Sequence, residues 1–158
     1  MKYAIFVDTR DCVGCYACEV ACKQEHNLPV GPRLIRVGSN GPRLIEGKLQ
    51  LRYEVEHCRH CAPARCVEHC PKGAITTRPD GITVISPELC DACKLCAKDC
   101  TFGMMQFDEI KKAAYKCDLC VERLDQGLKP ACVAACPSRC IYFGDKKEIS
   151  RKAGRKKN

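Results

Sequence analysis

Cysteine is the residue type in this chain that is most able to do chemistry, and the 158 residues contain seventeen of them. Sixteen fall into four runs of four, which open at Cys12, Cys58, Cys90 and Cys117. Such a content is otherwise confined to small disulfide scaffolds and metal proteins. The runs therefore indicate either a disulfide framework or a set of metal sites.

The four runs are variants of one spacing. The first and third are identical, C-x2-C-x2-C-x3-C, whereas the second has two extra residues before its third cysteine and the fourth has eleven residues between its second and third. The runs are Cys12, Cys15, Cys18 and Cys22; Cys58, Cys61, Cys66 and Cys70; Cys90, Cys93, Cys96 and Cys100; and Cys117, Cys120, Cys132 and Cys136. In two-cluster bacterial ferredoxins the fourth cysteine of each run ligates the other cluster, so runs work in pairs. Four runs predict two pairs and four [4Fe-4S] clusters.

The alternatives fit this spacing less well. Zinc needs only two C-x2-C pairs and gains nothing from a third cysteine two residues further on. Disulfides need an oxidising compartment, but Met1–Asp11 carries no export signal and the cysteine count is odd. No apolar run approaches the roughly 20 residues of a membrane span. We therefore expect a cytoplasmic protein whose thiols are free to bind iron.

Composition and charge agree with a metal-filled interior. Leu, Ile, Val and Phe together supply 33 of 158 residues, close to the level at which apolar burial alone stops folding a chain. The net charge is +8, but four oxidised clusters of about −2 each would bring it near zero, so no nucleic-acid partner is expected. Residues 146–158 keep seven Lys or Arg against one Glu. We expect a solvated, frayed tail there, with docking onto an acidic partner as the alternative.

Short, turn-rich elements should position the runs. The alternation and turn signals predict a strand over 2–8, a hairpin built from 31–35, 41–45 and 49–55, a strand over 82–85 after Asp80-Gly81, a helix over 121–126, and helical turns within 14–22 and 93–100.

Several of these segments resemble a known family. They are residues 58–75, 80–82, 90–100, 116–120 and 127–137, followed by Phe143-Gly144-Asp145. They are similar to four-cluster electron-transfer subunits of the dimethyl-sulfoxide-reductase type, and to the small polyferredoxins of formate dehydrogenase, formate hydrogenlyase and tungsten aldehyde oxidoreductase complexes. The resemblance covers residues 2–145, nearly the whole chain.

The resemblance implies that the runs pair in a nested order, the first with the fourth and the second with the third. The implied ligand sets are a first group of Cys12, Cys15, Cys18 and Cys136; a second group of Cys22, Cys117, Cys120 and Cys132; a third group of Cys58, Cys61, Cys66 and Cys100; and a fourth group of Cys70, Cys90, Cys93 and Cys96. The spacing agrees for the central pair, because the 19 residues between Cys70 and Cys90 suit a compact ferredoxin hairpin.

The implied fold is α+β and ferredoxin-like, with two pseudo-symmetric two-cluster units of short strands and helices. The outer unit comprises 1–57 and 101–145, with a hairpin insertion at about 31–55; the inner unit is 58–100, and the basic tail is 146–158. Larger relatives extend further at the C-terminus toward a membrane subunit. This sequence lacks that extension, so a soluble complex is expected.

The expected function is electron relay rather than catalysis. No phosphate-binding loop, nucleophile elbow or carboxylate pair is evident, and cubanes ligated only by cysteine leave no iron position for a substrate. The relay would join a catalytic subunit with a molybdenum or tungsten pterin, of the aldehyde oxidoreductase or formate dehydrogenase type, to a flavin, hydrogenase or ferredoxin partner in anaerobic metabolism. A self-stacking filament or assembly module is the alternative.

The remaining reactive side chains have simpler interpretations. We expect Cys140 to be a buried structural thiol, since it lies beside Ile141-Tyr142-Phe143. The three histidines of the second run should hydrogen-bond or pack around the ligands rather than bind metal; they are His57, His60 and His69. Met104-Met105 should pack against a cluster, and His26 carries no signal.

Overall fold

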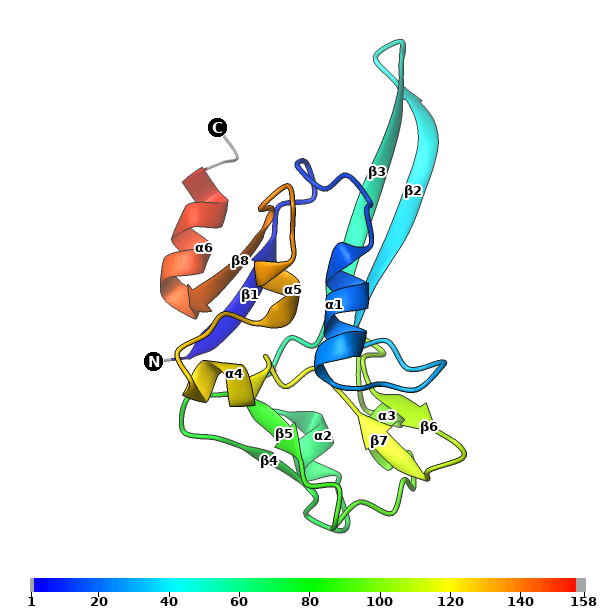
Figure 1. The fold of residues 1–158 in the computed structure, drawn as a ribbon, viewed down its shortest axis with the longest axis vertical. Helices are drawn as coiled ribbons and strands as arrows, with labels where there is room; N and C mark the ends of the chain where they lie inside the picture. The colour runs from blue at the N-terminus through cyan, green and yellow to red at the C-terminus, as the bar shows by residue number, and fades with distance from the viewer. Residues whose placement is uncertain (1, 156–158) are drawn as a thin grey trace.

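The computed structural model describes residues 2–155, which form an α+β fold of short helices and two-stranded antiparallel ribbons (Figure 1). The ribbons pair β1 with β8, β2 with β3, β4 with β5 and β6 with β7. The strands are β1 Tyr3–Val7, β2 Ile35–Ile45, β3 Lys48–His57, β4 Ile75–Thr77, β5 Thr83–Ile85, β6 Gln106–Asp108, β7 Ala113–Tyr115 and β8 Ile141–Asp145. The helices are α1 Ala17–Glu25, α2 Arg65–Glu68, α3 Leu95–Lys98, α4 Val121–Asp125, α5 Ala131–Ala134 and α6 Lys146–Arg155.

The first and last strands bring the two ends of the chain together. β1 and β8 are antiparallel, with Ile5 opposite Phe143, and the rings of Tyr3 and Phe143 stack with centroids 5.1 Å apart. Beside this ribbon α1 packs against α5 (Figure 1). Because α1 carries the end of the first cysteine run and α5 lies in the fourth, the two runs become neighbours despite their separation in sequence.

The middle of the chain repeats this arrangement on a smaller scale. β4 and β5 form a short hairpin in which Ile75 lies opposite Ile85, and its turn is held by the Asp80 carboxylate, which accepts a hydrogen bond from the Ile82 N–H at 3.1 Å. Helices α2 and α3 pack together beside it. The second and third runs are therefore adjacent.

The predicted hairpin is present, but with different limits. β2 includes residues 41–45 and turns into β3 through Glu46 and Gly47, whose positive φ values of 51° and 74° suit a tight two-residue turn. Residues 31–34 precede the strand, so their assignment to the hairpin was wrong. Gly41-Pro42 interrupts β2 as a register shift rather than a turn. The hairpin extends away from the body as a long arm (Figure 1).

Two contacts with Glu19, one of them buried, anchor the base of this arm and the segment before it to α1. The Val37 N–H donates to the Glu19 carboxylate at 2.5 Å, and Arg33 lies 3.4 Å from the other carboxylate oxygen. Glu19 is buried on the same helix that carries Cys18 and Cys22. The hairpin base thus fixes the orientation of the helix that presents these two thiols.

The remaining element predictions have mixed outcomes. The strands over 2–8 and 82–85 and the helix over 121–126 are confirmed as β1, β5 and α4. The two helical turns begin later than expected, at Ala17 and Leu95, because Tyr16 and Lys94 adopt left-handed backbone angles with φ of 60° and 65°. Tyr16 and Lys94 turn the chain between the second and third cysteines of the first and third runs, respectively.

The basic segment is ordered over most of its length. Residues 146–155 form α6, which packs against β1 and β8, and Ile149 is buried. The Lys146 N–H donates to the Lys2 carbonyl at 2.8 Å, which continues the β1–β8 edge into the helix. The expectation of a frayed tail is therefore wrong for this stretch, because Ile149 provides a packing contact; residues 156–158 lie outside the described part.

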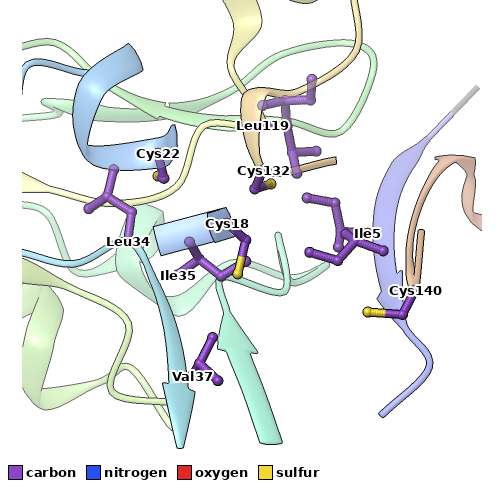
Figure 2. Close-up of a cluster of buried hydrophobic side chains, with 11 residues drawn as sticks. Ile5, Cys18, Cys22, Leu34, Ile35, Val37, Leu119, Cys132 and Cys140 are labelled. Atoms are coloured by element: carbon purple, nitrogen blue, oxygen red, sulfur yellow. The ribbon is translucent and has the colours of Figure 1, made fainter. Parts of the chain in front are cut away.

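Sulfur is a large part of the core. Of the eleven buried residues in the main hydrophobic cluster, four are cysteines, and further cysteines of the first and fourth runs pack around them (Figure 2). Those labelled in Figure 2 are Ile5, Cys18, Cys22, Leu34, Ile35, Val37, Leu119, Cys132 and Cys140. A second, smaller cluster holds Cys96 with Ile75 and Met105, surrounded by cysteines of the second and third runs. Each apolar cluster is therefore also a cluster of thiols.

One glycine tests how tightly the first cysteine loop is held. Gly14 has φ +64°, and a Cβ there would lie 2.2 Å from Cε1 of Tyr53 on β3, whereas Gly127, with φ +75°, has no atom within 4 Å of that position. Both alanine variants should lose about 1–2 kcal/mol from backbone strain, and Gly14→Ala should lose about 1–3 kcal/mol more because the ring must move.

The measurement is the melting temperature of the cluster-loaded chain, where each kcal/mol corresponds to about 2–4 °C. In a Tyr53→Ala background, Gly14→Ala should cost no more than Gly127→Ala. Equal melting temperatures for the two single variants would show that the Tyr53 contact does not restrain the loop.

Candidate metal centres

All seventeen cysteines are free thiols rather than disulfides. Most are buried or half-buried, but Cys15, Cys61 and Cys93 are exposed. Metal binding requires thiols that are free and that converge from several parts of the chain. The arrangement of the thiols relative to one another therefore decides what they can hold.

The third group surrounds a cavity. This cavity has a volume of about 110 Å³, and all four cysteines of the group line it, with three from the second run and Cys100 from the third. Met104, Met105 and Phe102 close its apolar side, which agrees with the packing expected for the methionines. The Met104 N–H also points at the Cys100 sulfur from 3.3 Å.

The fourth group surrounds a smaller cavity of about 10 Å³. It is lined by Cys90, Cys93 and Cys96 of the third run and by Cys70 of the second. Three thiols of one run thus face the last cysteine of the other in both cavities. The second and third runs exchange their final cysteines.

The first and fourth runs converge in the same crosswise manner. Cys22 lies close enough to Cys132 and Cys120 for their thiols to interact, although Cys22 belongs to the first run and they belong to the fourth. Cys117 likewise interacts with Cys132. The structure therefore brings the members of the second group together from the two ends of the chain.

The first group is held more loosely. Cys18 interacts with Cys12, while Cys136 contacts Cys140, which in turn interacts with Cys12. Cys15 is exposed and lies in the loop between Cys12 and Cys18.

Thiols of neighbouring groups also lie within electrostatic range of one another, which gives the groups an order. Cys18 of the first group is near Cys132 of the second. Cys117 of the second is near Cys58 of the third. Cys66 of the third is near Cys96 of the fourth. The four groups therefore follow one another in a single series.

Burial makes these thiols weak acids in the absence of metal. It raises the pKa of Cys18, Cys96 and Cys120 to about 11 and that of Cys132 to about 12. Neighbouring thiols add to the shift at Cys18, Cys96 and Cys132, and nearby carboxylates add to it at Cys120. A bound metal reverses this preference, because a coordinating thiol is deprotonated outright. Metal binding is thus expected to release protons.

A buried cation lies between the second and third groups. Lys116 is 6% exposed, and its ammonium donates to the carbonyls of Thr83 and Cys117; among residues 2–155 it has no carboxylate partner. A buried charge without a counter-ion is costly. Clusters ligated by four thiolates carry net negative charge in both adjacent groups, so Lys116 suits a cluster-loaded state.

These observations fit [4Fe-4S] clusters. Each group offers four thiols, two of the groups enclose cavities, and the nearest buried cation matches an anionic occupant. Thiolates are the donors that iron–sulfur clusters prefer.

Comparison with known proteins agrees with this chemistry. Residues 49–146 match a sequence family described as "4Fe-4S dicluster domain", and residues 11–75 match another with the same description. Two dicluster domains correspond to four [4Fe-4S] clusters, so the predicted cofactor content is confirmed.

Three relatives illustrate the family. The B subunit of polysulfide reductase from Wolinella succinogenes is 36% identical over 146 residues, covering 91% of this chain and 76% of that one. The B subunit of anaerobic dimethyl sulfoxide reductase from Escherichia coli K12 is 34% identical over 160 residues, covering 97% and 78%. The thiosulfate reductase electron transfer subunit PhsB of Salmonella typhi is 34% identical over 159 residues, covering 98% and 83%.

The chain therefore belongs to the iron–sulfur subunit family of the dimethyl-sulfoxide-reductase type. The members of this family are electron-transfer subunits rather than catalytic ones, as expected from the sequence. No helix within residues 2–155 combines the length and apolarity that a membrane crossing requires.

The histidines of the second run take roles around the thiols. His57 Nδ1 lies 2.9 Å from the Cys58 carbonyl, His69 Nδ1 lies 2.6 Å from the Asp99 carboxylate, and His60 Nδ1 accepts from the Thr83 N–H at 3.0 Å. These contacts agree with hydrogen bonding rather than ligation. The Cys140 thiol is buried as expected, with its sulfur 3.6 Å from that of Cys136.

The contact of His26 with a proposed ligand was not predicted from the sequence. Its Nε2 lies 3.5 Å from the Cys120 sulfur and 3.4 Å from the Asp118 carboxylate, which itself accepts from the Cys120 N–H at 2.8 Å. A lone histidine shortly after Cys22 carries no local pattern. The contact arises only because the fourth run folds back onto the end of α1.

Proposed function

We propose that this subunit relays electrons along four clusters between a catalytic oxidoreductase subunit and a second redox partner. The observation that carries the proposal is the serial order of the cysteine groups. Neighbouring groups are linked by electrostatic interaction between the thiols of Cys18 and Cys132, Cys58 and Cys117, and Cys66 and Cys96. When bound, each cluster supplies one-electron redox chemistry. A series of such sites divides a chain of about 40 Å diameter into steps of about 10 Å, short enough for tunnelling.

The proposed ligands are the four groups named above. The support is strongest for the third and fourth groups, because each lines one cavity. We also propose that the two pairs of groups divide the chain into an outer unit, 1–57 with 101–145, and an inner unit, 58–100. The β1–β8 ribbon and the contact between α2 and α3 support this division.

The ends of the series would be the contact points for partners. Cys15 of the first group and Cys93 of the fourth are both exposed, as is Cys61 of the third, so a cluster at either end would lie near the surface. One end would face a molybdenum or tungsten pterin subunit, and the other a flavin, hydrogenase or ferredoxin partner. Aldehydes and formate are candidate substrates of the complex, and the names of the relatives add sulfoxides, polysulfide and thiosulfate.

We place this exchange in the cytoplasm. The support is that all seventeen thiols are free, which suits a reducing compartment.

A pair of neighbouring cysteines tests the ligand assignment. Cys136 is a proposed ligand of the first group, whereas Cys140, whose sulfur is 3.6 Å away, is not. Cys136→Ala should lower the iron content from about sixteen to about twelve atoms per chain, since one cubane holds four. Cys140→Ala should leave about sixteen.

The measurement is anaerobic iron and sulfide analysis of each purified variant. The double variant shows whether Cys140 replaces its neighbour as a ligand when Cys136 is absent. Full iron content in the double variant, or loss of iron in Cys140→Ala with full retention in Cys136→Ala, would refute this assignment.

The relay itself is tested with the pterin subunit that co-purifies without air. The broad cluster absorbance near about 400 nm should bleach when the chain, that subunit and an electron-donating substrate, formate or an aldehyde, are combined. In a chain reduced beforehand it should return when that subunit and an electron-accepting substrate, a sulfoxide, polysulfide or thiosulfate, are added. Neither change should occur when the subunit is omitted. Size-exclusion chromatography provides the control for the stacking alternative. A cluster-loaded chain that forms large assemblies by itself and is never reduced through a pterin subunit would overturn the relay in favour of that alternative.

A further inference from the structure

One buried histidine, His60, donates no side-chain hydrogen bond to the described residues around it. His60 lies between Cys58 and Cys61, its side chain is 8% exposed, and it lines the cavity of the third group together with all four cysteines. Its Nε2 has no hydrogen-bond partner among residues 2–155. An unsatisfied buried polar group costs about 1–3 kcal/mol, so this atom needs an explanation.

The other ring nitrogen fixes which atom carries the proton. The Thr83 N–H, which can only donate, points at His60 Nδ1 from 3.0 Å in a buried contact. Nδ1 must therefore accept. A ring nitrogen that accepts a hydrogen bond carries no hydrogen, so the imidazole is neutral. In a neutral imidazole the hydrogen then resides on Nε2.

A chain of hydrogen bonds through Thr83 fixes the position of the His60 ring. Thr83 is 1% exposed, its N–H is used by His60, and its carbonyl accepts from the buried Lys116 ammonium. Thr83 of β5 therefore holds the His60 ring through its N–H, and Lys116 holds Thr83 through its carbonyl. A histidine held this rigidly presents its Nε2–H in one direction.

We propose that the Nε2–H of His60 donates a hydrogen bond to a sulfur of the cluster held by the third group, and that this bond raises the reduction potential of that cluster above the value it would otherwise have. Hydrogen bonds to cluster sulfurs are one of the levers that set such potentials. Reduction adds negative charge to the acceptor, so the bond strengthens and favours the reduced form. The inference rests on the proposed function, since it assumes a cluster in this group.

A second histidine of the same loop serves as a matched control. His57 is 6% exposed and also adjoins Cys58, but its Nδ1 meets the Cys58 carbonyl and it does not line the cavity. Like His60, His57 is a buried histidine that lies one residue from a cysteine of the third group. It differs in not lining the cavity of the third group.

The experiment is an anaerobic redox titration of the cluster-loaded chain, followed by electron paramagnetic resonance. In His60→Leu, the reduction potential of one of the four transitions should fall by about 59 mV. For a one-electron couple this corresponds to a tenfold decrease in the equilibrium constant for reduction. His60→Gln, which keeps an N–H donor, should shift it less. His57→Gln should leave all four transitions in place.

A second readout covers the case in which His60→Leu loses the cluster. In a His26→Gln background, which removes the histidine beside Cys120, the chain labelled with 15N-histidine should show a 15N hyperfine coupling to a reduced cluster. This coupling should persist when His57→Gln is added and vanish when His60→Gln is added. Four unmoved transitions at full iron content, or a coupling unaffected by His60→Gln, would overturn the inference. Fewer than four transitions in the unsubstituted chain would instead count against the proposed function.

Discussion

Thiols from opposite parts of the chain meet in shared groups, and the rest of the structure depends on this crosswise meeting. The main hydrophobic cluster contains four cysteines among eleven buried residues, and its companion is also lined with cysteines. Apart from β2 and β3 the strands are short, and the ribbons have two strands each, an architecture that is marginal without further support. Bonds from iron to thiolates in different runs supply that support, because each bond joins segments that no long helix or wide sheet connects.

The same arrangement explains where positive charge is needed. The polypeptide has a net charge of +8, and Lys116 lies buried between two groups with only carbonyl partners among the described residues. Both features are unfavourable in a metal-free chain and favourable beside anionic clusters. Lys116 also holds Thr83, and through it His60, so the residue that balances charge also orders the donor at the third group.

The sequence predicted the parts of the structure that depend on local spacing. Cysteine runs, the Asp80-Gly81 turn and the helix before Gly127 each carry a local pattern, and the nested pairing followed from family resemblance. Contacts made by the tertiary fold were not accessible in this way. His26 meets Cys120 only after the fourth run returns to α1, and α6 is ordered because Ile149 packs onto the β1–β8 ribbon. The direction of the His60 ring likewise depends on β5, which lies 23 residues away.

The central claim is that clusters replace the apolar core, and removing iron tests it most directly. The measurement is thermal unfolding followed by circular dichroism, under anaerobic and reducing conditions, before and after iron is extracted with a chelator. The loaded chain should unfold in one cooperative transition, and the extracted chain should show none, since its buried thiols would then surround empty space. A cooperative transition that survives complete extraction of the iron would contradict this account.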